Sequence, residues 1–188
     1  MECGHEGYAR LVGRVDDLTH LIAERRAGDL ACGRGCTACC RVQLTLSPVE
    51  AMAVRVALAG LSRATRERIR ARAGLLAGAE QLERHTPCVM LEEDGGCAIY
   101  ASRPLVCRTQ GHALRYPIGT LPDEAIFALS DGGEITWCPL NYGNEPPCSE
   151  DVLEAERIDE LLARLDRMAA PSAEAALERT SLLDLARE

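Results

Sequence analysis

The chain has 188 residues, of which ten are cysteines, and a formal net charge of −8. All 21 basic residues are arginine, so catalysis by lysine is excluded. The acidic balance argues against a nucleic-acid binder, because such a protein needs surplus positive charge to displace counterions. The length and the 47% hydrophobic content fit one domain over 1–188 that buries a core without cross-links.

The amino-terminal segment is polar and acidic, and it lacks the basic region and apolar stretch of a signal peptide. No apolar run approaches the ~18 residues that a membrane-spanning helix needs. We therefore expect a cytoplasmic protein with no membrane association. Thiols stay reduced in the cytoplasm, so ten cysteines there indicate metal binding in preference to disulfides.

Helices are predicted before an irregular middle segment. Apolar residues at helical spacing predict an amphipathic helix over 8–27. The sequence Ser-Pro-Val-Glu at 47–50 combines a cap, a proline at the first helical position and a glutamate at the third, which predicts a helix over 48–58. Ser62 is expected to cap a third helix that runs to about residue 84.

The middle segment, 87–147, is dominated by glycine, proline and cysteine and shows no helical periodicity. Within it, 125–129 and 134–137 are predicted to pair as a β-hairpin across a Ser-Asp-Gly-Gly turn. Beyond it, helices are predicted over about 150–169 and 172–187.

These elements predict a mainly α fold, in which helices pack around an irregular cysteine-rich metal-binding core with a small β-hairpin. The core is expected over 30–140, and the segments 8–27 and 149–187 are expected to flank it as helices. Aromatic residues make up only 3% of the chain, so Leu, Ala, Val and Ile must form most of the hydrophobic interior.

Four cysteines within nine residues give the strongest chemical signal: Cys32, Cys36, Cys39 and Cys40, in the spacing C-x3-C-x2-C-C. Two thiolates separated by two residues can reach one metal from a single turn. Cys39 and Cys40 are adjacent, so their side chains diverge and are expected to bind different metals or different corners of a cluster. The alternative, that these are small buried hydrophobic residues, fits poorly beside glycine and arginine.

A second group of cysteines lies further along the chain. It consists of Cys88, Cys97 and Cys107 and, beyond the predicted hairpin, Cys138. The two groups together supply eight candidate metal ligands. Two other cysteines are left out of this set. Position 3 lies at an amino terminus that is expected to fray, and position 148 lies in a proline-rich segment.

Several ordered motifs extend this pattern across most of the chain. They are Cys-Gly-Arg-Gly-Cys-Thr-Ala-Cys-Cys at 32–40, Leu-Ser-Pro-Val-Glu at 46–50, Pro87-Cys88-x2-Leu91 and Gly96-Cys97-x-Ile99-Tyr100-x2-Arg103-Pro104-x2-Cys107-Arg108. In these motifs the chain resembles the YkgJ-type cysteine-cluster family, a zinc- or iron-chelating CxxCxxCC domain, over about 30–140. The resemblance implies a metal-chelating domain built from these cysteines.

One further similarity concerns the metal, and one departure concerns the ligands. A similar cysteine arrangement occurs in the flagellin lysine methylases, and this resemblance implies an iron–sulfur cluster. The chain departs from the family's pattern at the first gap, since three residues separate Cys32 from Cys36 where the family's name implies two. Whether Cys32 or a neighbour completes the first site is therefore open.

Arginines near the cysteines are predicted to support the metal centre. Four thiolates around one divalent cation leave a charge of about −2. Nearby arginines can offset this charge and donate hydrogen bonds to sulfur; they are Arg34, Arg41, Arg103 and Arg108. We predict Arg103 and Arg108 as cofactor-binding residues, with the alternative that Arg103 only covers the turn beside it.

Other residues near the cysteines have weaker roles. His112 is the one histidine considered as a ligand, because it follows Cys107 by five positions. Tyr100 and Trp137 are expected to shield the site from water, and neither is assigned a catalytic role.

Thiolate ligands favour zinc, iron–sulfur clusters or Cu(I) over magnesium, calcium or manganese. Eight thiols suit two four-thiolate zinc sites, and they equally suit an iron–sulfur cluster with a further site. The adjacent cysteines and the methylase resemblance favour an iron–sulfur cluster, with zinc as the alternative.

We predict a metal-binding protein whose centre serves redox chemistry, sensing or protein modification. The alternatives are a zinc-stapled structural or adaptor domain and a metal-dependent enzyme of unknown substrate. The sequence contains no Gly-rich cofactor loop after a strand and no H-E-x-x-H motif, so whether the protein is an enzyme is open. A protein partner is expected, and nucleic acid is not.

Overall fold

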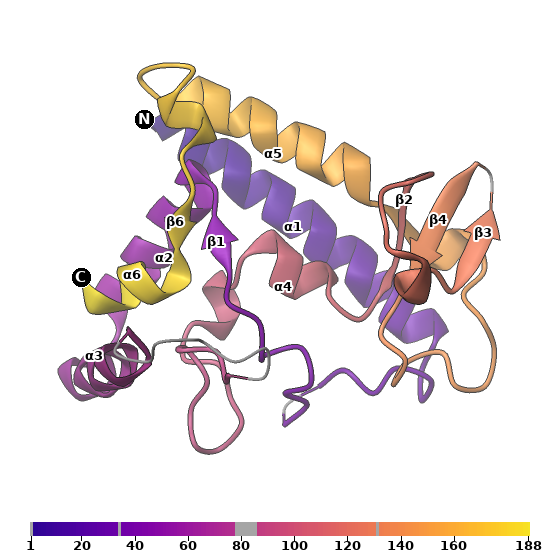
Figure 1. Cartoon of the computed structure of the whole chain (residues 1–188), viewed down its shortest axis with the longest axis horizontal. Coiled ribbons are helices and arrows are strands. Elements are labelled where there is room, and N and C mark those ends of the chain that lie inside the picture. The colour runs from indigo at the N-terminus through magenta and orange to yellow at the C-terminus, as the bar shows by residue number, and fades with distance from the viewer. Residues whose placement is uncertain (1, 34, 78–85, 131) are drawn as a thin grey trace. The chain divides into compact units, whose positions relative to one another are not determined.

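The computed structural model in Figure 1 describes residues 2–33, 35–77, 86–130 and 132–188. The chain divides into two compact units, which are described separately. Unit 1 comprises Met1–Tyr8, Gly33–Pro104 and Leu165–Glu188, and unit 2 comprises Ala9–Cys32 and Leu105–Arg164. Among the described residues, no helix combines the length and the apolar character needed to cross a membrane.

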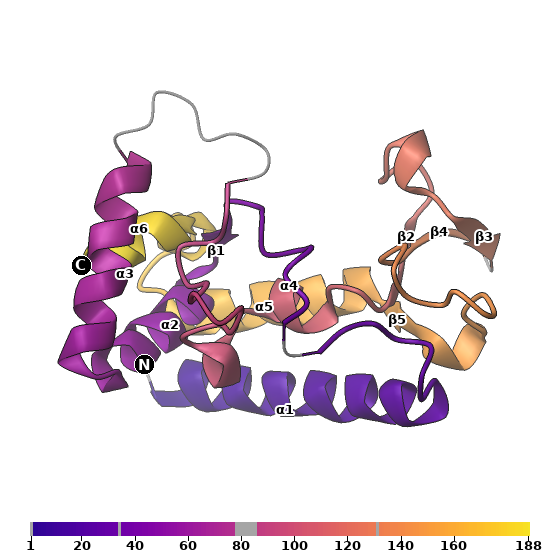
Figure 2. The same cartoon turned by 90° about the horizontal axis from the view of Figure 1, so that it is seen from below.

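Unit 1 is mostly helical. Its elements, in chain order, are the start of α1 (Glu2–Arg25), β1 (Thr45–Leu46), α2 (Pro48–Gly60), α3 (Arg63–Ala77), the 3-10 helices η1 (Tyr100–Ser102) and η4 (Ala175–Leu177), the end of α5 (Ala155–Ala169), β6 (Thr180–Ser181) and α6 (Leu182–Arg187). Strands β1 and β6 pair antiparallel. Figures 1 and 2 show α6 beside α2 and α3, which it contacts.

The core of unit 1 forms where α2, α3 and α6 meet the loop 86–99. Leu46, Ile69, Met90 and Leu185 are fully buried in it. Half-buried cysteines at positions 88 and 97 pack against this core. The core therefore positions two of the predicted metal ligands.

Unit 2 contains a small sheet. Its elements are the remainder of α1, α4 (Leu105–Thr109), β2 (Ala113–Pro117), η2 (Asp123–Ala125), β3 (Ala128–Ser130), β4 (Gly133–Thr136), η3 (Ser149–Asp151), β5 (Val152–Glu154) and most of α5. The strand order is β3-β4-β2-β5. The first two pairs are antiparallel and the pair β2–β5 is parallel. Ala113, Ile135 and Tyr142 form the buried centre of this unit.

The predicted fold class is confirmed, because helices predominate around an irregular cysteine-bearing segment with a small sheet. The predicted hairpin is confirmed as β3 and β4. The helix start at Pro48 is also confirmed, since the backbone N–H of Ser47 donates to the Glu50 carboxylate at 3.2 Å.

Other predicted boundaries are wrong. Helix α1 begins at Glu2 and not at residue 8, so position 3 lies within a helix. The predicted helix over 150–169 begins only at Ala155, because 152–154 pairs with β2 as a strand. The predicted helix over 172–187 is replaced by a 3-10 turn, the strand β6 and the short α6, since 180–181 pairs with β1.

The third predicted helix, α3, ends at Ala77, and its predicted continuation over 78–84 lies outside the described residues. The chain falls into two compact units, whereas one domain over 1–188 was expected; whether the two act as one folding domain stays a prediction.

Substituting Gly4 with alanine is expected to destabilise the fold. A Cβ on Gly4 would lie 2.6 Å from the Cβ and 3.4 Å from the Cα of Ala169, and neither atom can rotate away. We expect the free energy of unfolding to fall by about 1–3 kcal/mol, measured by urea denaturation. The control is Gly13→Ala, because the Cβ position of Gly13 has no described neighbour within 4 Å. There helix propensity predicts a gain of about 1 kcal/mol, and equal effects of the two substitutions would contradict the tight contact.

Candidate metal centre

Five of the eight predicted ligands belong to unit 1: Cys36, Cys39, Cys40, Cys88 and Cys97. They come from two segments, the turn 33–40 and the loop 86–99. The backbone joins these segments directly, since the N–H of Cys88 donates to the carbonyl of Cys40 at 2.8 Å. Unit 1 therefore brings together thiols that are far apart in the sequence.

The loop that contains the second segment is folded tightly. The carbonyl of Cys88 accepts from the N–H of Leu91 at 3.0 Å, and Leu91 forms an antiparallel bridge with Cys97. The N–H of Ala98 donates to the carbonyl of Met90 at 2.9 Å. These bonds hold Cys88 and Cys97 at the neck of one loop.

The sulfurs of unit 1 affect one another's protonation. The Cys39 residue is exposed overall, but partial burial of its thiol and the neighbouring Cys40 thiol raise the pKa of Cys39 to about 11. Burial, followed by the Cys88 thiol, raises the pKa of Cys40. Burial also raises the pKa of Cys88, and the charge of Cys97 adds to the rise. A negative charge on one sulfur disfavours ionisation of its neighbours, so these thiols keep their protons. A cation that binds here has to replace those protons.

Two arginines offset negative charge at these thiols. Burial raises the pKa of Cys88, and the guanidinium of Arg72 partly opposes that rise. Arg72 is held in place by the carbonyl of Val89, to which it donates at 2.6 Å. Arg103 opposes in the same way the rise that burial causes in the pKa of Cys97. Arg103 is one of the two predicted supporting arginines, whereas Arg72, on α3, has no motif that marks it.

Tyr100 was expected to shield the centre from water. Its residue is 58% exposed, and the guanidinium of Arg103 lies over its ring, 4.0 Å from the centroid. The shielding role of Tyr100 stays a prediction.

The other three predicted ligands, Cys32, Cys107 and Cys138, belong to unit 2. The side-chain amide of Asn141 donates to the sulfur of Cys32 at 3.2 Å, and the backbone N–H of Asn141 donates to the carbonyl of Cys138 at 2.8 Å. Cys107 lies in the short helix α4. Within unit 2, Cys32 thus contacts a residue more than a hundred positions away in the sequence.

The second predicted supporting arginine, Arg108, is also in unit 2. It is 6% exposed, and its Nη1 donates to the carboxylate of Asp16 on α1 at 2.5 Å. The Asp16 carboxylate therefore neutralises much of the Arg108 charge, which was expected to offset the charge of thiolates. Its role toward a cofactor stays a prediction.

The remaining residues of interest in unit 2 have other contacts. The thiol of Cys148 donates to the carboxylate of Asp151 at 3.1 Å, and its omission from the ligand set stays a prediction. His112 is buried, and its ligation stays a prediction. The Trp137 ring packs against the rings of Phe127 and Tyr142, with centroids 5.0 and 6.1 Å away.

The described cysteines are all free thiols. Within the described residues, no three histidine, cysteine, aspartate or glutamate side chains are close enough together to hold a metal ion. The eight-ligand set therefore stays a prediction. The structure does regroup it, as five thiols in unit 1 and three in unit 2. The sequence grouping, four and four by proximity along the chain, differs from this arrangement.

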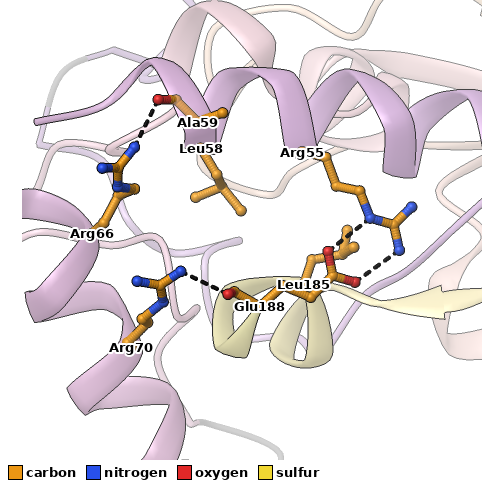
Figure 3. A pocket seen from close by; sticks show the side chains of 7 residues that line it. All are labelled: Arg55, Leu58, Ala59, Arg66, Arg70, Leu185 and Glu188. Atoms are coloured by element: carbon orange, nitrogen blue, oxygen red, sulfur yellow. Dashed lines mark hydrogen bonds and ion pairs between the residues drawn. The ribbon is translucent and has the colours of Figure 1, made fainter. Parts of the chain in front are cut away.

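A cavity of about 310 Å³ lies elsewhere in unit 1, between α2, α3 and α6 (Figure 3). It contains no thiol, and the arginines that line it bind other groups of the chain. Arg55 forms two bonds of 2.8 Å to the Glu188 carboxylate, Arg70 donates to the Glu188 carbonyl at 2.6 Å, and Arg66 donates to the Ala59 carbonyl at 2.8 Å. This cavity is separate from the cysteines.

Thiols on two segments that a backbone hydrogen bond joins, with arginines beside them, are the donor set of a domain that binds thiophilic metals. The family model described as "CxxCxxCC: Putative zinc- or iron-chelating domain" matches residues 31–139, which is more than half of the chain. The chain belongs to this family, and the predicted family is confirmed. Neither a curated protein nor a solved structure matches the chain.

Proposed function

We propose that unit 1 holds an iron–sulfur cluster through its cysteine thiolates and serves redox chemistry or sensing. The observation that supports this most directly is the gathering of five thiols from two segments. A single zinc ion needs only four thiolates. The adjacent Cys39 and Cys40, whose side chains are hydrogen-bonded to each other, suit neighbouring positions of a polynuclear centre.

The residues of the chain would hold the cluster from two sides. Cys88 and Cys97 pack against the core of unit 1, so they would fix one side of the cluster. The cysteines of the turn 33–40 would close the set by rotation about χ1, which costs little for a small side chain. When bound, the cluster supplies one-electron redox chemistry. Arg72 and Arg103 offset thiolate charge, which raises the reduction potential.

Elemental analysis of protein purified without oxygen tests this proposal. We expect brown protein that contains iron and acid-labile sulfide, with a visible absorbance that dithionite bleaches reversibly. Colourless protein that contains zinc would contradict the cluster and favour the zinc-stapled adaptor. In that case, removing the zinc with a chelator is expected to unfold unit 1. Protein without zinc or iron would contradict metal binding itself.

A further inference from the structure

Asn141 is a fully buried polar residue in unit 2, with 2% of its surface exposed. Its Oδ1 accepts from the backbone N–H of Ala31 at 2.8 Å, and its Nδ2 donates to the carbonyl of Gly111 at 2.7 Å. A backbone N–H can only donate and a backbone carbonyl can only accept, so these two bonds fix which end of the amide is which. The second N–H of the amide then faces the sulfur of Cys32, 3.2 Å away.

The sulfur of Cys32 is placed to accept this bond at 3.2 Å, and its thiol can also donate to the Oδ1 of the same amide across a longer 3.8 Å. A neutral thiol is a weak acceptor, whereas a thiolate accepts strongly, and metal-bound thiolates are commonly held by N–H donors of this kind. The amide therefore holds the sulfur of Cys32 at one position in unit 2. Asn141 also requires no rearrangement to do so, because its other two bonds are made to the backbone.

Gly111 provides the space for this arrangement. Its φ of +102° lies in the left-handed region that favours glycine. A Cβ at this position would lie 2.5 Å from the sulfur of Cys32 and 3.9 Å from the Cβ of Cys138. Both cysteines thus lie against the same glycine, and the backbone N–H of Cys138 donates to its carbonyl at 3.4 Å.

We propose that Asn141 is a positioning residue for metal binding, which holds the sulfur of Cys32 beside Cys138 as a ligand for a thiophilic cation. The proposal rests on the proposed function only in that thiolates of this chain bind metal. It concerns unit 2, whereas the cluster concerns unit 1. The site belongs to residues that sequence spacing did not group together.

The test uses the full chain without oxygen and Co²⁺ as the probe, because sulfur-to-cobalt charge-transfer bands report thiolate ligation. The Cys32→Ser variant defines the part of the bands that depends on Cys32. In Asn141→Ala we expect the cobalt affinity of the site that contains Cys32 to fall by about 10–100-fold. The charge-transfer bands that depend on Cys32 should also shift. The matched control is Asn144→Ala, since Asn144 is the exposed asparagine three positions away, and we expect it to match the wild type.

A double-mutant cycle separates positioning from a purely structural role. In the Cys32→Ser background, Asn141→Ala should cause no further loss of cobalt affinity. An equal loss in both backgrounds, or unchanged bands and affinity in Asn141→Ala, would overturn the proposal. So would a wild-type spectrum in Cys32→Ser.

A further variant tests metal binding by unit 1 separately from the role of Asn141. Cys39→Ser removes a thiol of unit 1 and leaves the residues around Asn141 unchanged. Cobalt bands that depend on Cys32 should persist in this variant. If instead all bands disappear in Cys39→Ser, the Cys32 sulfur has no separate role and the proposal is wrong, although metal binding by unit 1 stands.

Discussion

Replacing both Cys39 and Cys40 with serine is expected to abolish metal binding by unit 1. A serine hydroxyl stays protonated at neutral pH and is a poor ligand for soft metals. Cys40 also lies close to the other thiols of unit 1, since Cys88, Cys97 and Cys36 each raise its pKa after the larger effect of burial. Loss of a hydrogen-bonded support alone costs about 10–100-fold in metal affinity, so the loss of two ligands should exceed this.

The same substitution should lower stability whenever metal is present. A ligand at 100 times its Kd stabilises the folded state by about 2.7 kcal/mol, and this contribution disappears with binding. Elemental analysis and thermal unfolding, each with and without a chelator, measure the two effects. In the double variant the chelator should no longer change the unfolding temperature.

Cys148→Ser is the matched control for these substitutions. The Cys148 thiol lies in unit 2 and donates to Asp151, a bond that a serine hydroxyl can also make. Metal content and unfolding temperature should therefore match the wild type. Unchanged metal content in the double variant, or equal loss in Cys148→Ser, would contradict the assignment of Cys39 and Cys40 as ligands.

The chemistry of the centre could be predicted from the sequence, but the grouping of its thiols could not. Cysteine spacing is local information, and it predicted the metal-chelating family that the match over 31–139 confirms. Cys32, however, is placed by the side-chain amide of Asn141, which accepts from the N–H of Ala31 and donates to the Cys32 sulfur. Such a contact depends on how distant segments fold, and no spacing rule connects positions 32 and 141.

The same limit applies to the arginines and to the carboxyl-terminal elements. Arg72 is one of several arginines on α3, and only its bond to Val89 places it beside the thiols. Residues 152–154 have a sequence compatible with helix, but β2 supplies a parallel pairing partner that local propensity does not include. By contrast, the start of α2 was predictable because its capping residues act within one turn.

Replacing Asp151 with alanine is expected to have the largest effect on stability away from the cysteines. Its side chain is 1% exposed and forms an ion pair with Arg26 at 2.6 Å and a weaker one with Arg25 at 3.4 Å. It also accepts from the N–H and the thiol of Cys148 at 3.0 and 3.1 Å. Alanine would leave the Arg26 guanidinium only its longer ion pairs, to Asp29 at 4.0 Å and Glu145 at 3.8 Å. Because breaking a buried pair is costly, we expect a loss of about 3 kcal/mol in the free energy of unfolding. Urea denaturation at neutral pH measures it.

The control for this substitution changes another acidic partner of the same arginine, Arg26. Glu145 also pairs with Arg26, at 3.8 Å, but its side chain is 81% exposed. Glu145→Gln should change the free energy of unfolding by less than about 1 kcal/mol. Equal effects of Asp151→Ala and Glu145→Gln would contradict a role for burial in the Asp151 pair.

The Asp151 pair should also depend on pH. Burial alone would raise the pKa of Asp151, but hydrogen bonds from Arg26 and Cys148 hold that pKa below its ordinary value. The stabilisation is therefore fully present above the unfolded pKa of about 3.9, and it is lost as the pH falls through the lower pKa of the folded state. The difference in unfolding free energy between Glu145→Gln and Asp151→Asn should accordingly shrink below about pH 4. A difference that stays constant down to pH 2 would mean that the charge of Asp151 contributes nothing, and that its shape and neutral hydrogen bonds hold this part of unit 2 together.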